Sequence, residues 1–144
     1  MNHQKTVSHR EQGQGLVEFA LGATILLILL VGLIDLGRAL FTWMALRDAA
    51  QEGASYGSLY PDQNSAIETR ARNTSNRPVN LADTSLVTVQ INLLGPACAA
   101  SEIEVIVTYP NFQLTTPLLS SILGRSTIPI RARVTDTVLT PPCE

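Results

Sequence analysis

The sequence predicts an α+β protein in which a long N-terminal transmembrane and stalk helix precedes a short helix and a small antiparallel three-stranded sheet. Residues 19–34 form a run of 16 residues without a charge, and eleven of them are Phe, Leu, Ile or Val. Beyond residue 86, apolar and polar residues alternate in three stretches, which is the periodicity of half-buried strands. The 144 residues correspond to about one domain.

The run 19–34 is expected to cross a membrane. As a helix it measures about 24 Å, and residues 15–17 and 36–37 extend it toward the roughly 30 Å of a hydrocarbon core. A buried core helix is less favoured, because the chain contains no comparably apolar partner helix. A cleaved secretory signal is also less favoured, because the run continues in a helical pattern through residues 35–41.

The flanking charges predict the orientation of the span. Lys5, Arg10 and two histidines outweigh Glu11 in the first twelve residues, which favours a cytoplasmic N-terminus and an exterior C-terminal part. Composition excludes other classes. Charged residues make up 15% and the net charge is −2, so the chain has neither the basic stripe of a nucleic-acid binder nor the composition of a disordered tail.

The most informative motif lies at the head of the span, where residues 13–19 read GQGLVEF. A glycine precedes a carboxylate by five residues, and an aromatic residue follows that carboxylate. This stretch resembles the leader-peptidase site of Tad-type (type IVc) prepilins, G-x-x-x-x-E-[YF]. Together with the apolar helix and the sequence DLGR at 35–38, it resembles the TadE-like family over roughly residues 13–56.

That resemblance implies that a membrane prepilin peptidase cuts after Gly13, so that a mature chain of 131 residues begins at Gln14. Glu18 would then be the fifth residue and would neutralise a new terminal amine, its own or a neighbour's, and Phe19 would be the sixth. The implied partners are membrane lipid, the peptidase, other pilin or pseudopilin subunits and Tad assembly proteins. A plainer interpretation of Glu18 is a helix N-terminal charge that the macrodipole favours.

Asp35 and Arg38 are three residues apart and therefore neighbours on one helix face. The favoured interpretation is an exposed ion pair that marks the outer end of the span and stops it from sliding into the bilayer. The alternative is a contact between subunits.

The helix is expected to continue to about residue 57, since the first proline is Pro61. Small residues recur every four positions, which lets a second backbone approach closely. This stripe can pack on the chain's own exterior part, between subunits, or both. It consists of Ala45, Ala49, Gly53 and Gly57.

The expected organisation is a cytoplasmic leader over 1–13, a transmembrane and stalk helix over 14–60, and an exterior domain over 61–144. The exterior domain is expected to hold a helix over 63–74 with Asp62 as its cap and a short helix over 117–124. The expected strands are 87–93, 102–109 and 128–135, with Pro129 placing the third at an edge. Glu102 and Glu104 should share the solvent face with Arg131 and Arg133 and pair across the ladder.

An up-down-up order of these strands brings both cysteines to one end of the sheet. Cys98 lies between the first two strands and Cys143 follows the third, so an exterior location permits a disulfide between them. Its loop of about 46 residues would stabilise the fold by about 4 kcal/mol on the chain-entropy model.

No catalytic, cofactor or metal site is expected. The two histidines both lie in the head, and the mature chain would contain neither histidine nor lysine. No Gly-x-Ser-x-Gly elbow or phosphate loop occurs. The sequence therefore favours a non-enzymatic, pilin-related structural subunit, a minor pilin or pseudopilin. The alternative is an uncleaved single-pass membrane protein whose exterior domain binds another envelope protein.

Overall fold

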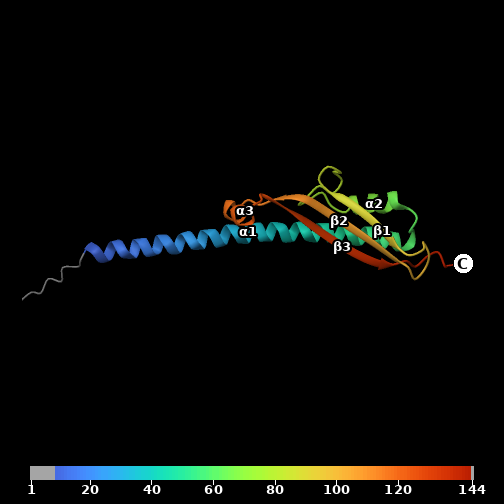
Figure 1. The fold of residues 1–144 in the computed structure, drawn as a ribbon, viewed down its shortest axis with the longest axis horizontal. Coiled ribbons are helices and arrows are strands. Elements are labelled where there is room, and N and C mark those ends of the chain that lie inside the picture. Colours follow the sequence, from blue (N-terminus) through green and yellow to red (C-terminus); the bar gives the residue numbers. More distant parts are fainter. Residues whose placement is uncertain (1–8, 144) are drawn as a thin grey trace, which may run out of the picture.

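The computed structural model describes residues 9–143, so residues 1–8 of the expected leader lie outside the described part. The predicted fold class is confirmed: a long helix is followed by a short helix and a three-stranded antiparallel sheet. Figure 1 shows the part of the chain that follows the long helix, which keeps the name exterior domain from the expectation above, lying along the second half of that helix, while the first half projects from it. In chain order, the elements are α1 (His9–Leu59), α2 (Asn64–Arg72), β1 (Thr88–Leu94), β2 (Glu102–Gln113), α3 (Pro117–Leu123) and β3 (Thr127–Thr137).

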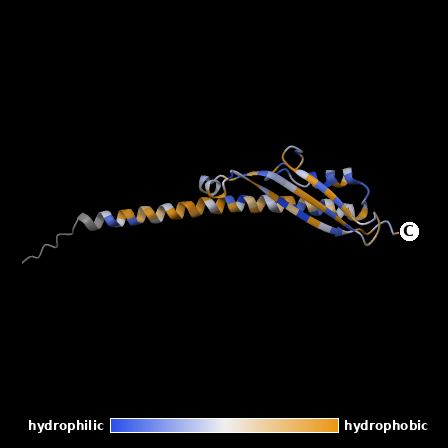
Figure 2. Cartoon of the chain, viewed as in Figure 1, coloured by the Kyte–Doolittle hydropathy of each residue, from blue (hydrophilic) through white to orange (hydrophobic). Residues whose placement is uncertain are grey.

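Helix α1 has 51 residues and is therefore about 77 Å long. No proline interrupts it, and leucine and alanine, which are strong helix formers, are frequent throughout. Its most apolar window of 18 residues has a mean hydropathy of 2.6, and none of that window is buried in the structure. Figure 2 shows this apolar colour concentrated on the projecting half. By length and composition, α1 can cross a membrane.

The sheet is a meander in the order β1-β2-β3, so β3 lies at an edge as Pro129 predicted. Val105 in the central strand faces Ile91 of β1 and Val134 of β3. The expected end of the second strand at Tyr109 was wrong, because β2 continues to Gln113 through a register shift between Tyr109 and Phe112. A bulge at this point accommodates Pro110, which cannot donate a ladder hydrogen bond.

The core lies between one face of the sheet and the second half of α1, with α2 closing one side. Ile103 and Val105 from β2 contact α1 where it carries glycine, so the central strand lies close to the helix. Burial of these side chains is the main force that holds the exterior domain on the stalk. The largest fully buried residues are Leu46, Ile67, Leu81, Val87, Ile103, Val105, Val107 and Val138.

Helix α2 is shorter than expected and starts differently. It begins at Asn64 with Gln63 as N-cap, and that N-cap makes no side-chain capping hydrogen bond, so the expected cap at Asp62 was wrong. The helix is held instead by its buried face, since Ile67 and Ala71 are fully buried. Tertiary packing rather than a cap thus determines where α2 starts.

The outer face of the sheet contains one of the expected charge pairs. Arg133 Nη1 lies 3.0 Å from Glu104 Oε1, and Asn92 Nδ2 donates to Glu104 Oε2 at 2.9 Å. The other two of these four charges, Glu102 and Arg131, do not pair with each other, because the ladder places them opposite Thr137 and Thr108 respectively.

The far end of the exterior domain is tied to the end of α1. Cys98 and Cys143 form a disulfide with a Cα–Cα distance of 5.1 Å, between the β1–β2 connection and the segment after β3. In that segment, Leu139 N donates to Ser58 O and Thr140 Oγ1 donates to Leu59 O, both at 2.8 Å. These bonds satisfy carbonyl groups that the helix end leaves without partners.

Candidate membrane-anchoring and assembly site

The projecting half of α1 exposes apolar side chains on all sides. Between Leu16 and Ile34, the large apolar side chains are between 38% and 74% exposed. A monomeric soluble protein rarely exposes so large a continuous apolar surface. This surface therefore suits lipid or the helices of other subunits. It comprises Leu16, Val17, Phe19, Leu21, Ile25, Leu26, Leu27, Ile28, Leu29, Leu30, Val31, Leu33 and Ile34.

Glu18 is the one charged residue between positions 13 and 34. Its side chain is exposed near the start of the apolar surface, and the adjacent Phe19 is 74% exposed. Gln14 precedes Glu18 by four residues in the same helix, so the two positions share a face. A Cβ added at Gly13 would meet no atom within 4 Å, so nothing else in the described chain crowds the expected cleavage position.

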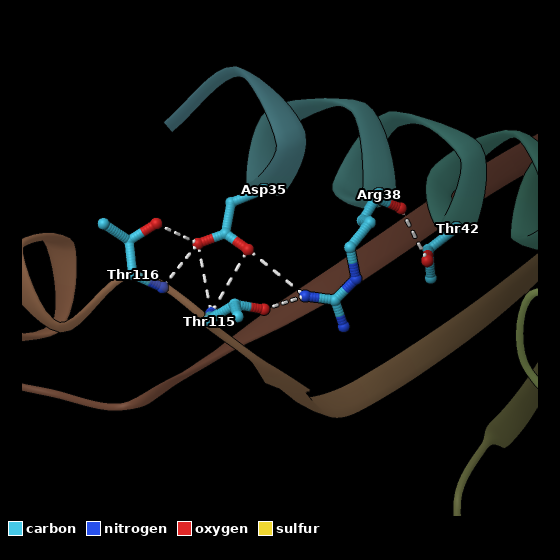
Figure 3. A network of polar contacts seen from close by, with 5 residues as sticks. All are labelled: Asp35, Arg38, Thr42, Thr115 and Thr116. Carbon is cyan, nitrogen blue, oxygen red and sulfur yellow. Dashed lines mark hydrogen bonds and ion pairs between the residues drawn. The ribbon is translucent and has the colours of Figure 1, made fainter. Parts of the chain in front are cut away.

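Asp35 is the first charged residue after this apolar surface, and its carboxylate joins α1 to the β2–α3 connection (Figure 3). Thr116 donates its backbone N–H to Asp35 Oδ2 at 2.8 Å and its hydroxyl to the same oxygen at 2.5 Å. Thr115 N lies 3.2 Å from Oδ1 and 3.1 Å from Oδ2. Hydrogen bonds to an ionised acceptor are stronger than those between neutral groups.

Arg38 completes this junction. Its Nη1 lies 3.2 Å from Asp35 Oδ1 and also donates to Thr115 Oγ1. The guanidinium carbon lies 5.2 Å from the centre of the Phe112 ring, which is within cation–π range. The arginine therefore contacts both α1 and β2 while its side chain stays 48% exposed.

The ion pair between Asp35 and Arg38 forms as expected, but its interpretation as an exposed pair was wrong for the carboxylate. Asp35 is only 2% exposed, because the loop that starts at Thr115 covers it. Its partners lie 80 and 81 residues away along the sequence. The sequence Thr115-Thr116-Pro117 does carry a helix-start signal, a threonine before a proline at the first helical position. Nothing in that signal identifies a carboxylate on α1.

The small-residue stripe packs within the chain over most of its length. Ala49 is fully buried, Ala45 is half-buried, and Gly53 and Gly57 are buried. A Cβ built on Gly57 would lie 2.5 Å from Ile103 Cδ1. One built on Gly53 would lie 3.3 Å from both Ala71 Cβ and Val105 Cγ1. The second half of α1 thus uses its small residues to receive the sheet and α2.

Comparison with known families identifies the N-terminal part of the chain. Residues 13–55 match the family model described as TadE-like protein. The match covers the head motif, the apolar surface and most of the stripe, and it ends before α2 and the sheet. No curated protein and no solved structure matches the chain. The matched segment is therefore similar to a family that is pilus-related and structural. The resemblance found from the head motif is thus supported by the family comparison, which shows that residues 13–55 are similar to the TadE-like family.

Proposed function

We propose that the chain is a minor pilin or pseudopilin of a Tad-type pilus or a related secretion apparatus. In this proposal it is matured by a prepilin peptidase and assembles with other subunits and Tad assembly proteins through α1. The observation that carries the proposal is the lone carboxylate of Glu18 at the head of a bare apolar helix whose outer half already holds a folded domain.

The proposed organisation assigns residues 1–13 to a cytoplasmic leader, 14–60 to the anchor and stalk, and 61–144 to the exterior domain. Three observations support this assignment. The projecting half of α1 is apolar and exposed, the positive residues precede it, and the exterior domain contains a disulfide. Disulfides persist outside the reducing cytoplasm, which agrees with an exterior location.

Glu18 needs a cationic partner once it enters lipid or a bundle of helices. An unpaired charge in apolar surroundings is costly, so such residues pair with an opposite charge or lie at the membrane edge. Lys5, the one lysine of the chain, belongs to the proposed leader. Cleavage after Gly13 therefore creates the one amine of the mature chain at Gln14, one helical turn from Glu18. The same amine lies within reach of Glu18 in a neighbouring subunit if two copies of α1 pack with a small axial offset.

We expect α1 to unwind locally at the proposed cleavage position. Residues 13 and 14 are helical in the structure, whereas a protease cleft takes its substrate in extended form. Gly13 and Gly15 each lower helix stability by about 1 kcal/mol relative to alanine, so the first turns of α1 unwind at low cost. A bulky residue at position 13 would strengthen the helix. It would also have to fit a position in the peptidase cleft that accepts glycine.

The N-terminus of protein extracted from membranes tests processing. With an active prepilin peptidase, we expect intact-mass and N-terminal peptide analysis to find a chain that begins at Gln14. A cyclised Gln14, which has lost ammonia, counts equally as cleavage because it requires a free N-terminus.

Two variants make the test specific. Gly13→Leu should keep residues 1–13, whereas Gly22→Leu should be processed normally. Gly22 is a matched control, because it lies in the same helix and a Cβ there also meets nothing within 4 Å. Recovery of uncut wild-type chain alongside active peptidase would contradict the proposal. It would favour the alternative, an uncleaved single-pass protein whose exterior domain binds an envelope partner.

A further inference from the structure

Helix α3 is an apolar segment on the surface of the exterior domain. Residues 114–124 contain no charged residue. Ile122 is 78% exposed and Leu123 is 50% exposed, so two large aliphatic side chains project from one end of this short helix. Exposed apolar groups clustered in this way mark a contact surface.

The position of α3 along the stalk shows which environment it meets. Thr116, its N-cap, is bonded to Asp35, the first charged residue after the apolar surface of α1. In Figure 1, α3 lies beside α1 at the end of the exterior domain that is nearest to the projecting half. Asp35 thus holds α3 at the level where the charge-free segment of α1 ends. If that surface lies in lipid, α3 lies at the boundary between lipid and water.

Several polar groups of α3 and of the connection before it have partners within the chain. Ser120 Oγ and Ser121 Oγ each donate to Pro117 O at 2.8 Å. Pro117, at the first helical position, has no N–H, and the N–H groups of Thr115 and Thr116 are bonded to Asp35. Such internal partners lower the free-energy cost of moving these groups toward the apolar side of a membrane boundary.

Cationic side chains flank this apolar segment. Arg125 is exposed and lies directly after Gly124, the C-cap of α3. The side chain of Arg38 is 48% exposed beside the start of the helix. Arginine at this level can reach lipid phosphates while its neighbours contact acyl chains.

From these observations we infer that α3 inserts into the headgroup–acyl boundary of the outer leaflet and gives the chain a second membrane contact beside the span. The occupant of this surface is the bilayer, and its apolar contact continues that of α1. The inference rests on the proposed membrane insertion of α1. Two contacts on one bilayer restrict the tilt of the exterior domain, which a single helix would leave free.

Depth-dependent fluorescence quenching tests this inference on the full chain in vesicles of phosphatidylcholine and phosphatidylglycerol. In the Ile122→Cys variant, the introduced thiol carries an environment-sensitive fluorophore, while the native disulfide stays oxidised and unlabelled. Leu27→Cys, in the apolar surface of α1, is the lipid reference, and Thr135→Cys, exposed on β3, is the water reference. All three positions are exposed, so labelling leaves the core intact.

We expect the label at position 122 to show blue-shifted emission, quenching by nitroxides near the lipid carbonyl groups, and loss of quenching by aqueous iodide relative to position 135. If iodide quenches positions 122 and 135 equally while position 27 stays in lipid, the inference is wrong and membrane anchoring stands. If iodide also reaches position 27, the anchoring itself is wrong. Energy transfer between labels at position 122 on two copies, with shielding from both quenchers, would show that a second subunit covers α3 and would also overturn the inference.

Discussion

Replacing Asp35 should release the β2–α3 connection from the stalk while leaving the rest of the exterior domain folded. The carboxylate receives the N–H of Thr115 and both the N–H and the hydroxyl of Thr116. A hydrogen bond to a charged group contributes about 1.5–3 kcal/mol, and Thr116 is buried at 3% exposure. Thr115 is exposed, so its lost bond is largely replaced by water.

Counting the two donors of Thr116 alone, and allowing the opened loop to regain water, we expect Asp35→Ala to lower the free energy of local opening by about 3 kcal/mol. This corresponds to about a 100-fold faster amide exchange at Thr115 and Thr116. Asp35→Asn keeps one acceptor oxygen and should give about a tenfold effect.

Hydrogen–deuterium exchange of the full chain in detergent micelles measures this change directly. Asp48→Ala is the matched control, because Asp48 is an exposed carboxylate on the same helix. The exchange of core amides in β2, around Val105, should stay unchanged in all three variants. Unaltered protection of Thr116 in Asp35→Ala would refute the proposed role of the carboxylate.

The remaining predictions concern the packing of the exterior domain, with the urea unfolding midpoint in detergent as the measurement. Gly57→Leu should destabilise the domain by about 2 kcal/mol or more, because its side chain meets buried Ile103 and overpacking outweighs the gain in helix propensity. Ser55→Leu, at an exposed position of the same helix, should be nearly neutral, and equal midpoints for the two variants would contradict the packing described. Cys143→Ser should cost about 4 kcal/mol and remove the effect of a reductant, since the disulfide closes a loop with a sequence separation of 45. A reductant that leaves the wild-type midpoint unchanged would show that the bond to Cys98 does not contribute.

Local patterns in the sequence are sufficient to predict the elements of this fold. The charge-free run and the absence of proline predict α1, and alternation predicts three strands whose meander order brings Cys98 and Cys143 together. Strand ends are less predictable. A bulge carries β2 past Pro110, and whether a strand resumes after such a residue depends on its neighbour strand as well as on its own residues.

The candidate site is harder to predict because its partners are distant in sequence. Asp35 next to Arg38 has the spacing of an ordinary surface pair on a helix. Its burial depends on a loop 80 residues away, and no periodicity reports such a contact. The small-residue stripe has the same ambiguity. Spacing predicts that something packs closely on Gly53 and Gly57, whereas only the three-dimensional arrangement identifies the chain's own sheet and α2.

The segment that matches the TadE-like family and the exterior domain are different parts of the chain. The family match ends at residue 55, so the sheet, α2 and α3 lie outside it. The two parts are nevertheless joined at both ends of the sheet. At one end Thr116 donates to Asp35 of α1, and at the other end Leu139, which follows β3, donates to Ser58 near the end of α1. We expect the stalk and the exterior domain to move as one unit, because each end of the contact is held by hydrogen bonds.

Zero-length cross-linking most directly tests whether α1 is the docking surface. In the proposed mature form, residues 14–144 carry one amine, the N-terminus that cleavage would create, and a carbodiimide can couple it to a carboxylate that it contacts. A Gln14→Ala variant keeps this amine and cannot cyclise, so it is used in the assembled fraction. We predict a covalent dimer in which the amine of residue 14 is joined to Glu18 of a neighbouring copy, and the loss of that dimer in Glu18→Gln. A cross-link confined to single copies, or an assembled fraction that yields no linkage to Glu18, would contradict this role of α1.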